Sequence, residues 1–432
     1  MKNILIAEEI PSRNKGEAAI LFGFLDLLKK IEREDINFSM FTFDKNSNDF
    51  NKEGIELVSY LENISNENEI IKFFTGIYFF IKLMIFSLFY SINRNLTDKL
   101  FTKEIWRVYS NADIVLVGHD GLLESLGSKT SKKHENWTFF FTYCSIFIYK
   151  ILMKKKVIIL AASIGAYSSA FIRKIAKISL NYVDLITLRD SKSYNYLETL
   201  NIKKPFSLTA DLAFLMKPEP SNNLLLHKEL TYLMNLNNIV GMTISNQFSQ
   251  FRFPEIDSIE NKYKEHLVFY SQVIDYIIEK YDSDIVLISH AIKKDKDDRM
   301  VYYDLLELIN HKNKVHVLSK EYTPQLLKTF IGLCNIFIGE RTHSNVAAVS
   351  MGVPTIVISE PNSFRNSMFN NILEDEFICD ISKIEITALY EKIDKLIEMR
   401  DLYRNNILVK MGNIMNRSLE NGKFLLDIVF NE

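Results

Sequence analysis

The residues best suited to chemistry are an arginine and a histidine two positions apart, in the run Glu340-Arg341-Thr342-His343-Ser344. An apolar run precedes them at 336–338, and small residues and a second apolar run at 355–358 follow, which predicts strand, turn, helix and strand. Parallel sheets bind ligands beyond the carboxyl ends of their strands, where the first turn of a helix presents N–H groups to an anion. We therefore expect the substrate to carry phosphate, carboxylate or both, and to contact Glu340, Arg341, His343 and Ser344.

A second polar segment, Asn14-Lys15-Gly16-Glu17, follows the first expected strand and enters a helix. Gly16 permits close approach of another group to the backbone. A carboxylate in a first turn is often only a partner of the helix dipole. In the functional alternative, Asn14 orients a ligand and Glu17 is a general base on an acceptor hydroxyl. The position after a strand favours the functional interpretation.

Two small-residue turns also follow apolar runs, Gly118-His119-Asp120-Gly121 and Ser163-Ile164-Gly165. Such turns can present backbone N–H groups to oxyanions. Neither matches a dinucleotide or P-loop fingerprint, so no nucleotide cofactor is predicted. We expect substrate contacts from His119, Asp120, Ser163 and Gly165, while a structural role in its turn is the alternative for His119.

Four further expected strands end in Arg189, Asp211, Ser245 and His290. Arg189 could bind carboxylate or phosphate with two nitrogens, and its structural alternative is an ion pair with Asp190 or Asp211. A single polar strand end means little. A shared position around one cleft between two domains would make these residues a binding site.

The elements that must position these residues alternate between apolar runs and helical patterns. The expected strands of the first half are 3–7, 38–43, 113–117, 157–162 and 185–188. After a break at 217–223 the pattern restarts with strands at 239–244, 284–288, 315–318, 335–338 and 355–358. Such alternation predicts doubly wound α/β domains. We predict two Rossmann-like domains, 1–218 and 219–432, facing a central cleft, with C-terminal helices over 389–430.

Bulk composition excludes several classes of function. The 432 residues include 52 Lys and Arg and 54 Asp and Glu, which gives a net charge of −2 and no basic excess for nucleic acid. The cysteines at 144, 334 and 379 form no CxxC pair, as expected for reduced thiols of a cytoplasmic protein. No cluster has the spacing of metal ligands, so no metal is expected.

Two apolar stretches leave the relation to membranes open. Residues 70–92 approach the length that crosses a bilayer, but Lys82 interrupts them. Residues 139–153 run into Lys154-Lys155-Lys156, as in surface-bound amphipathic helices. The alternatives are a membrane span over 70–92, helices packed on a sheet, and a peripheral contact with a membrane surface.

Taken in order, these motifs resemble the polysaccharide pyruvyl transferase family. The matching pieces are Asn14-Lys15-Gly16-Glu17-Ala18-Ala19, the turn at 118–121, Ser163-Ile164-Gly165, Arg189-Asp190 with Ser193, Asp211-Leu212-Ala213-Phe214, and Arg341-Thr342-His343 with Gly352-Val353-Pro354. They cover most of the chain. The sequence departs from the family at 118–121, where the family more often shows a run of glycines.

The resemblance implies a GT-B-like pair of Rossmann domains that transfers pyruvate from phosphoenolpyruvate to a sugar of a surface polysaccharide or its precursor, forming a ketal. It implies an acceptor side at 1–218 and a donor side at 219–432, a glycan or lipid-linked oligosaccharide acceptor, and no cofactor beyond the donor substrate. Arg189, Arg341 and the N–H groups near Ser344 would bind the donor. His343 would be the acid or a phosphate ligand, and Glu17 or Asp211 the base.

The alternative is an enzyme of another kind, a GT-B nucleotide-sugar glycosyltransferase. A polar segment such as 340–344 followed by an Ala-rich helix also suits the donor site of such an enzyme. A non-catalytic glycan-binding protein with the same fold is a third class. The expected location is the cytoplasm, including the inner face of the membrane.

Overall fold

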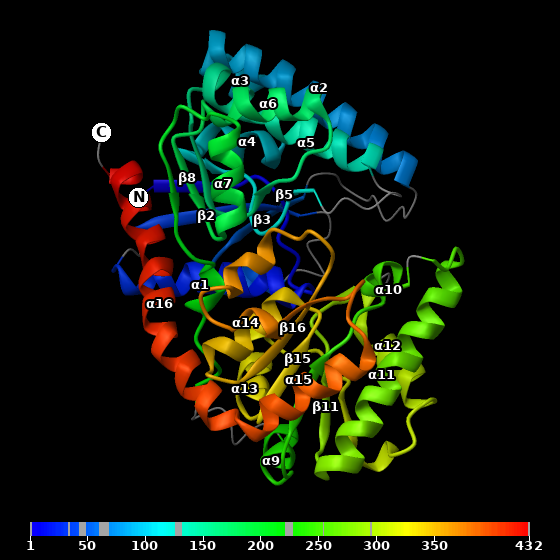
Figure 1. The fold of residues 1–432 in the computed structure, drawn as a ribbon. Helices are drawn as coiled ribbons and strands as arrows, with labels where there is room; N and C mark the ends of the chain where they lie inside the picture. Colours follow the sequence, from blue (N-terminus) through cyan, green and yellow to red (C-terminus); the bar gives the residue numbers. More distant parts are fainter. Residues whose placement is uncertain are drawn as a thin grey trace. The chain divides into compact units, whose positions relative to one another are not determined.

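The computed structural model describes residues 2–32, 35–42, 49–59, 69–125, 132–220, 228–253, 255–293 and 296–430, and shows two separate parallel sheets (Figure 1). Backbone contacts divide the chain into two compact units. Unit 1 comprises Met1–Ser12, Leu28–Asp211 and Glu420–Glu432, and unit 2 comprises Arg13–Leu27 and Leu212–Leu419. The units differ from the predicted division at residue 218. The main change falls after Asp211, residues 13–27 group with the second unit, and residues 420–432 group with the first.

The sheet of unit 1 has the order β3-β2-β1-β4-β6-β8-β9, and its neighbouring strands are all parallel. Its strands are β1 (Lys2–Ile6), β2 (Ile36–Thr42), β3 (Glu56–Ser59), β4 (Ile114–Leu116), β6 (Lys156–Ala162), β8 (Leu185–Leu188) and β9 (Phe206–Leu208). The chain adds β2 and β3 on one side of β1 and then turns to the other side at β4. Ligands bind at this kind of reversal in doubly wound sheets. Two short strands, β5 (Leu123–Glu124) and β7 (Ile164–Gly165), pair separately.

Helices cover the apolar strands of unit 1, since parallel strands must be buried on both faces. They are α2 (Glu69–Ile92), α3 (Arg94–Leu100), α4 (Glu104–Asn111), α5 (Lys132–Phe147), α6 (Ala170–Leu180) and α7 (Ser191–Thr199), with a 3-10 turn, η1 (Asp49–Glu53), and a π turn, η2 (Ile148–Leu152). Large aromatic side chains fill the core beside the sheet, including Phe41, Phe86, Tyr109 and Tyr143.

The sheet of unit 2 repeats the same winding, in the order β14-β11-β10-β15-β16-β17. Its strands are β10 (Val240–Thr243), β11 (Ile285–Ile288), β14 (Val315–Leu318), β15 (Ile336–Gly339), β16 (Thr355–Ser359) and β17 (Ile378–Asp380), and β12 (Ile292–Lys293) pairs with β13 (Lys296–Asp297) in a hairpin. The reversal lies between β10 and β15. The predicted doubly wound α/β class and the two Rossmann-like domains are confirmed by these two sheets.

The helical elements of unit 2 include α1 and α16, which both continue into unit 1. Their bounds are α1 (Lys15–Lys30), α9 (Lys228–Met234), α10 (Asn246–Arg252), α11 (Ile259–Tyr281), α12 (Asp298–Leu306), α13 (Pro324–Gly332), α14 (Thr342–Ser350), α15 (Ile386–Glu398) and α16 (Arg400–Phe430). Short 3-10 turns are η3 (Leu212–Phe214), η4 (Lys312–Lys314), η5 (Arg365–Phe369) and η6 (Asp375–Phe377).

The last helix returns to the first unit. The Asn421 amide of α16 is buried there, donates to Ala210 O at 3.0 Å, and accepts from the Thr187 and Thr209 hydroxyls at 2.7 and 2.9 Å. A buried amide with both ends satisfied fixes the helix at one register on the strand ends. Helical periodicity over 389–430 did not show this return, because spacing identifies a buried face but not its partner.

The long apolar helix α2 is neither fully buried in the core nor fully exposed. Residues 74–92 are long and apolar enough to cross a membrane, and only 17% of that window is buried. Leu83, Phe86 and Ser87 pack into unit 1, while apolar residues on the other side of the helix are exposed. The helix therefore has one core face and one apolar outer face.

Candidate functional site

The predicted polar segment 340–344, which we call the polar crest, lies at the reversal point of unit 2. Helix α14 begins at Thr342, directly after β15 and Arg341, as the sequence indicates. The ends of β10 and β15 are tied together, because the Ser245 N–H donates to Glu340 Oε2 at 2.6 Å and the hydroxyls of Thr243 and Ser344 lie 2.8 Å apart. At the start of α14 the N–H groups of Ser344 and Asn345 donate to Arg341 O at 3.1 and 3.2 Å, whereas those of Thr342 and His343 come before the first intrahelical hydrogen bond. This edge can therefore receive an anion.

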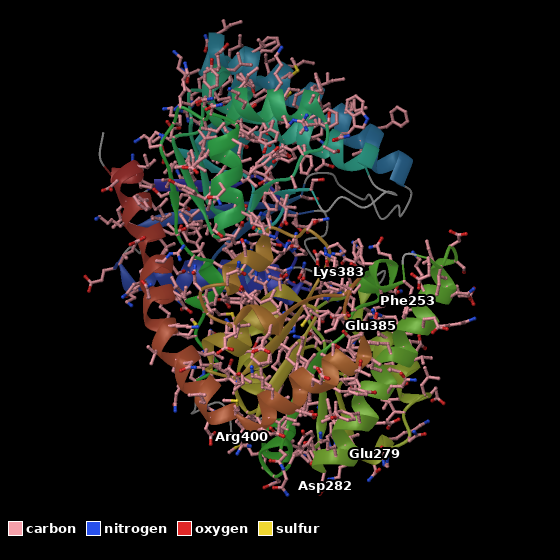
Figure 2. The ribbon with its side chains drawn as sticks, in the orientation of Figure 1. Phe253, Glu279, Asp282, Lys383, Glu385 and Arg400 are labelled. Atoms are coloured by element: carbon pink, nitrogen blue, oxygen red, sulfur yellow. The ribbon has the colours of Figure 1, made fainter. Side chains whose placement is uncertain are left out.

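Labelled side chains mark the two edges of unit 2 in Figure 2. Phe253 follows α10 and Lys383 and Glu385 follow β17, so they lie at the edge where the strands end (Figure 2). Glu279 and Asp282, at the end of α11, lie at the opposite edge. The crest at Arg341 belongs to the first of these edges because it follows β15.

Arg341 is oriented by a buried carboxylate. Arg341 Nη2 lies 2.6 Å from Asp298 Oδ1, and Nε lies 3.4 Å from Oδ2. Asp298 also accepts from the backbone N–H groups of His290 and Ala291, at 3.0 and 2.9 Å. The Arg341 side chain is still 20% exposed. A guanidinium held in this way keeps one side available for a second anion.

The N-terminal segment belongs to the same site. Asn14 pairs with Ala291 in an antiparallel bridge, and the Lys15 N–H donates to His290 O at 2.8 Å. A Cβ on Gly16 would lie 2.7 Å from His343 Nδ1, so the backbone there packs directly on that imidazole. The structure thus brings together Asn14, Gly16, Glu17, His290, Arg341 and His343 within one unit.

The buried imidazole of His290 lies in a positive field. Its pKa is lowered to about 3, first by burial and then by His343, Arg341 and Lys15. Its Nδ1 is buried without a hydrogen-bond partner in the described part of the chain. Lys15 is buried too, with its ammonium 3.0 Å from Glu321 Oε1. A bound anion would relieve this concentration of positive charge.

His290 should make stability depend on pH. Its pKa is about 3 in the folded chain and about 6.5 when unfolded, so between these values the unfolded chain binds more protons and the free energy of unfolding falls as the pH falls. At 1.36 kcal/mol per pH unit the loss is roughly 2–3 kcal/mol between pH 6.5 and 4.5. Urea unfolding of His290→Gln at both pH values should show a smaller loss than the wild type. Parallel losses in the two proteins would contradict the assignment.

Asn14 and Glu17 are held by each other. Asn14 Nδ2 donates to Glu17 Oε1 at 2.5 Å, in the first turn of α1. This contact fits the expected pair of an orienting amide and a carboxylate base, and both side chains are only partly buried. Their roles toward a substrate stay predictions.

Three other predicted residues support the crest from within. Glu340 is buried, accepts from the Tyr270 hydroxyl at 2.7 Å and lies 3.4 Å from His266 Nε2. The buried Ser245 caps α10, and Ser344 donates to Arg341 O at 2.7 Å. These contacts position the strand ends, and direct contact of the three side chains with a substrate stays a prediction.

The reversal point of unit 1 lies between β1 and β4, where Glu8 and His119 meet. Glu8 Oε2 accepts from the Gly118 N–H at 3.1 Å, and burial raises the pKa of Glu8 against the opposing effect of His119. Gly118 has φ +67°, and a Cβ there would lie 2.5 Å from Leu123 Cδ1, so this turn requires glycine. Sequence reasoning missed Glu8, because an acidic pair after a first strand has no distinguishing pattern.

The structure gives Arg189 the structural role that was its alternative. Its side chain has no exposure: Nη1 lies 2.6 Å from Asp211 Oδ2, Nη2 lies 2.6 Å from Asp120 Oδ1, and Nε donates to Ser163 Oγ at 2.8 Å. Asp211 is fully buried as well. Neither Arg189 as a donor clamp nor Asp211 as a base fits these contacts, since a buried ion pair is costly to break.

The residues around Arg189 build the same scaffold. Asp190 is the N-cap of α7 and accepts from the Ser193 N–H at 2.8 Å. The Ser193 hydroxyl accepts from the Ile164 N–H at 2.9 Å, which ties it to the turn before Gly165. Gly165 has φ +139° and pairs with Glu124. This cluster fixes the turns that hold Asp120, Ser163 and Gly165. Substrate contacts of these three residues and of His119 stay predictions.

Within the described ranges, no group of three or more His, Cys, Asp and Glu side chains is placed to hold a metal ion. The residues most able to bind a small anion are Lys15, His290, Arg341 and His343 of unit 2.

Comparison with known sequences gives a family and a relative. The family model for polysaccharide pyruvyl transferase matches residues 14–362. The amylovoran biosynthesis protein AmsJ of Erwinia amylovora is 24% identical over 218 residues, which is 48% of this chain. The match spans 50% of the length of that relative.

Comparison with solved structures gives GT-B-like enzymes. The UDP-GlcNAc 2-epimerase of Neisseria meningitidis, bound to UDP-GlcNAc, aligns with a TM-score of 0.58 at 16% identity, covering 99% of this chain and 100% of its own. The S. aureus MnaA–UDP co-structure has a TM-score of 0.59 at 12% identity, covering 99% and 96%. A UDP-glucosyltransferase from Polygonum tinctorium has a TM-score of 0.58 at 10% identity, covering 100% and 99%. At these identities the similarity shows the fold, which confirms the predicted GT-B-like class.

Proposed function

The chain belongs to the polysaccharide pyruvyl transferase family, and from this premise we propose that it transfers pyruvate from phosphoenolpyruvate to two hydroxyls of one sugar. The product is a pyruvate ketal on a surface polysaccharide or its precursor, and phosphate is released. One observation carries the choice of donor: Lys15, His290, Arg341 and His343 gather at one strand edge, with an imidazole nitrogen of His290 buried and unpaired among the described residues.

Phosphoenolpyruvate suits this cluster because its carboxylate and phosphate stand on one carbon. Asp298 contacts Nε and Nη2 of Arg341, and Nη1, which lies 3.5 Å from Gln247 Oε1, can bind one of these groups. The first turn of α14 and the imidazole of His343 can bind the other. A compact substrate with two anionic groups needs several cationic or N–H groups close together, whereas a single anion would not.

The reaction needs one acid and one base. A proton added to the methylene carbon gives an oxocarbenium-like centre at the phosphate-bearing carbon, and a sugar hydroxyl attacks that carbon and loses its proton. The C–O bond to phosphate then breaks, and the second hydroxyl adds and loses its proton. His343 is our candidate acid and Glu17 our candidate base, since Asn14 and Gly16 hold the two side chains at neighbouring positions.

The acceptor is a glycan, and we propose a cytoplasmic site of action that includes the inner face of the membrane. Two observations support this. The relative AmsJ is described as a biosynthesis protein for amylovoran. The three cysteines of this chain are free thiols, as is usual in a reducing compartment. The acceptor can be polymeric or lipid-linked.

The test is phosphate release from phosphoenolpyruvate in the presence and absence of a glycan acceptor. We expect release only with the acceptor, together with a product whose mass has gained one ketal-linked pyruvate. The rival is a nucleotide-sugar glycosyltransferase, because the similar structures include enzymes bound to UDP or UDP-GlcNAc. Glycosyl transfer from a UDP-sugar without any response to phosphoenolpyruvate would decide for that rival.

Gly16→Ala should reduce activity without unfolding the protein. The new methyl group would lie 2.7 to 3.1 Å from Nδ1, Cβ and Cγ of His343, so the imidazole must move. A displacement near 1 Å costs on the order of 100-fold in rate. The acceptor-dependent rate measures the loss. Gly412→Ala is the matched control, because a Cβ there meets nothing within 4 Å and the rate should be unchanged. Equal rates for the two variants would argue against a role for His343.

A further inference from the structure

Helix α2 exposes a continuous apolar face to solvent. Large apolar side chains recur every three or four residues on this face, each at least 41% exposed: Tyr78, Ile81, Met84, Ile85, Leu88, Phe89 and Ile92. The opposite face of the helix is fixed by Leu83 and Phe86, which are buried in the core of unit 1. Soluble proteins seldom expose so much contiguous apolar surface to water, which indicates that this face binds a partner.

Two neighbouring helices extend the apolar face. Ring contacts join α2 to α5 through Phe80 and Phe141, with centroids 5.1 Å apart, and α5 to α6 through Phe140 and Phe171, 5.9 Å apart. The three helices therefore lie side by side (Figure 1). Their exposed apolar side chains also include Trp137, Phe171, Ile178 and Tyr182. We call these exposed side chains of α2, α5, α6 and the adjoining Tyr182 the three-helix face.

The acidic residues of these helices lie only at the N-terminal ends, at Glu69 of α2 and Glu135 of α5. Residues 74–92, 136–147 and 170–180 contain Lys82, Arg173, Lys174 and Lys177 and no aspartate or glutamate, although the whole chain carries −2. Lys174 and Lys177 are exposed beside Phe171 and Ile178. Basic residues beside apolar and aromatic ones suit the interface of a bilayer with anionic lipids.

We propose that the three-helix face binds the surface of a bilayer that contains anionic lipids, with α2 lying in the plane of the interface. A spanning orientation does not fit, because one side of α2 packs on Trp106 and Tyr109 of the core. A second copy of the chain is a poorer occupant, because the basic residues of two such faces would meet and repel each other. This inference does not depend on the proposed reaction. It adds a lipid bilayer as a binding partner of the protein.

Vesicle sedimentation with the full chain tests the proposal. We expect binding to vesicles of phosphatidylcholine with phosphatidylglycerol and weaker binding to phosphatidylcholine alone. The variant Ile81→Gln, Ile85→Gln, Leu88→Gln should bind about tenfold or more weakly, since it removes apolar area that enters the interface. The control Ile259→Gln, Leu402→Gln, Val409→Gln changes exposed apolar residues of α11 and α16 and should bind as the wild type.

A charge variant tests the contribution of the basic residues to membrane binding. Lys174→Glu with Lys177→Glu should lower binding by about tenfold or more, and salt should weaken wild-type binding. Thermal unfolding and acceptor-dependent phosphate release in solution should be unchanged in all variants. The proposal is overturned if the wild type does not bind the anionic vesicles, or if the α2 variant binds as the control does. It is also overturned if the wild type is a dimer in size-exclusion chromatography that the α2 variant converts to a monomer.

Discussion

Arg341→Ala should lower kcat/KM for phosphoenolpyruvate by about 10²- to 10³-fold, the range found when one preorganised donor to a developing anion is removed. The guanidinium is placed by Asp298, which is itself fixed by two backbone N–H groups, so no other side chain can take over its position. The loss should appear in kcat as well as in KM, because charge builds on the departing phosphate during the reaction. Acceptor-dependent phosphate release at varied donor concentration measures both constants.

Arg299→Ala is the matched control for Arg341→Ala. Arg299 follows Asp298 on α12 and forms an ion pair with Asp297 at 2.6 Å, in which both side chains are partly exposed. Its removal should change kcat/KM by less than about threefold, since exposed pairs contribute little. Arg341→Lys should fall between the two, because it keeps the charge but loses the planar pair of donors. Full activity of Arg341→Ala would show that phosphoenolpyruvate does not bind at this strand edge.

Sequence reasoning succeeded where the information is local. The strands around 336–339 and 355–359 were predicted because apolar runs of this length bounded by polar turns suit buried parallel strands. The edge strands β3 and β17 were missed because edge strands are short and less apolar, and β3 begins with an exposed glutamate. Arg341 and His343 were found because the motif places them next to each other.

The failures concern partners that are distant in the chain. Asn14 and Glu17 were assigned to the first half, yet they lie against His290 and His343, because the bridge from Asn14 to Ala291 ties this segment to unit 2. Asp298 was missed because it lies 43 residues from Arg341 in a charged run that reads as a solvated helix start. No local period or motif encodes such pairings.

Arg189 shows how burial decides between two readings of one residue. A strand-end arginine in a matching motif suggests a substrate ligand, and periodicity cannot reveal whether carboxylates surround it. The structure places Asp120, Asp211 and Ser163 around its guanidinium and leaves the side chain no exposure. The contacts of Arg189 therefore support a structural role, and anion binding at unit 2 is our proposal.

Arg189→Met should lower the free energy of unfolding by about 3–5 kcal/mol, the cost of removing one partner from a buried ion pair. The charge of Asp211 would be left in a site with no exposure, and Asp120 would lose its contact as well. Urea unfolding followed by circular dichroism measures the loss. Lys150→Met is the control, because the Lys150 pair with Asp184 is partly exposed and should contribute less than about 1 kcal/mol.

A second variant separates structure from binding at this position. Arg189→Met combined with Asp211→Leu should recover part of the lost stability, because the unpaired carboxylate that makes the single change costly is removed with it. Recovered stability with recovered phosphate release would establish that Arg189 acts by holding the turns of unit 1. Normal stability of the single variant with a large rise in KM for phosphoenolpyruvate would instead return Arg189 to the donor site, since a clamp on substrate contributes to binding and not to folding.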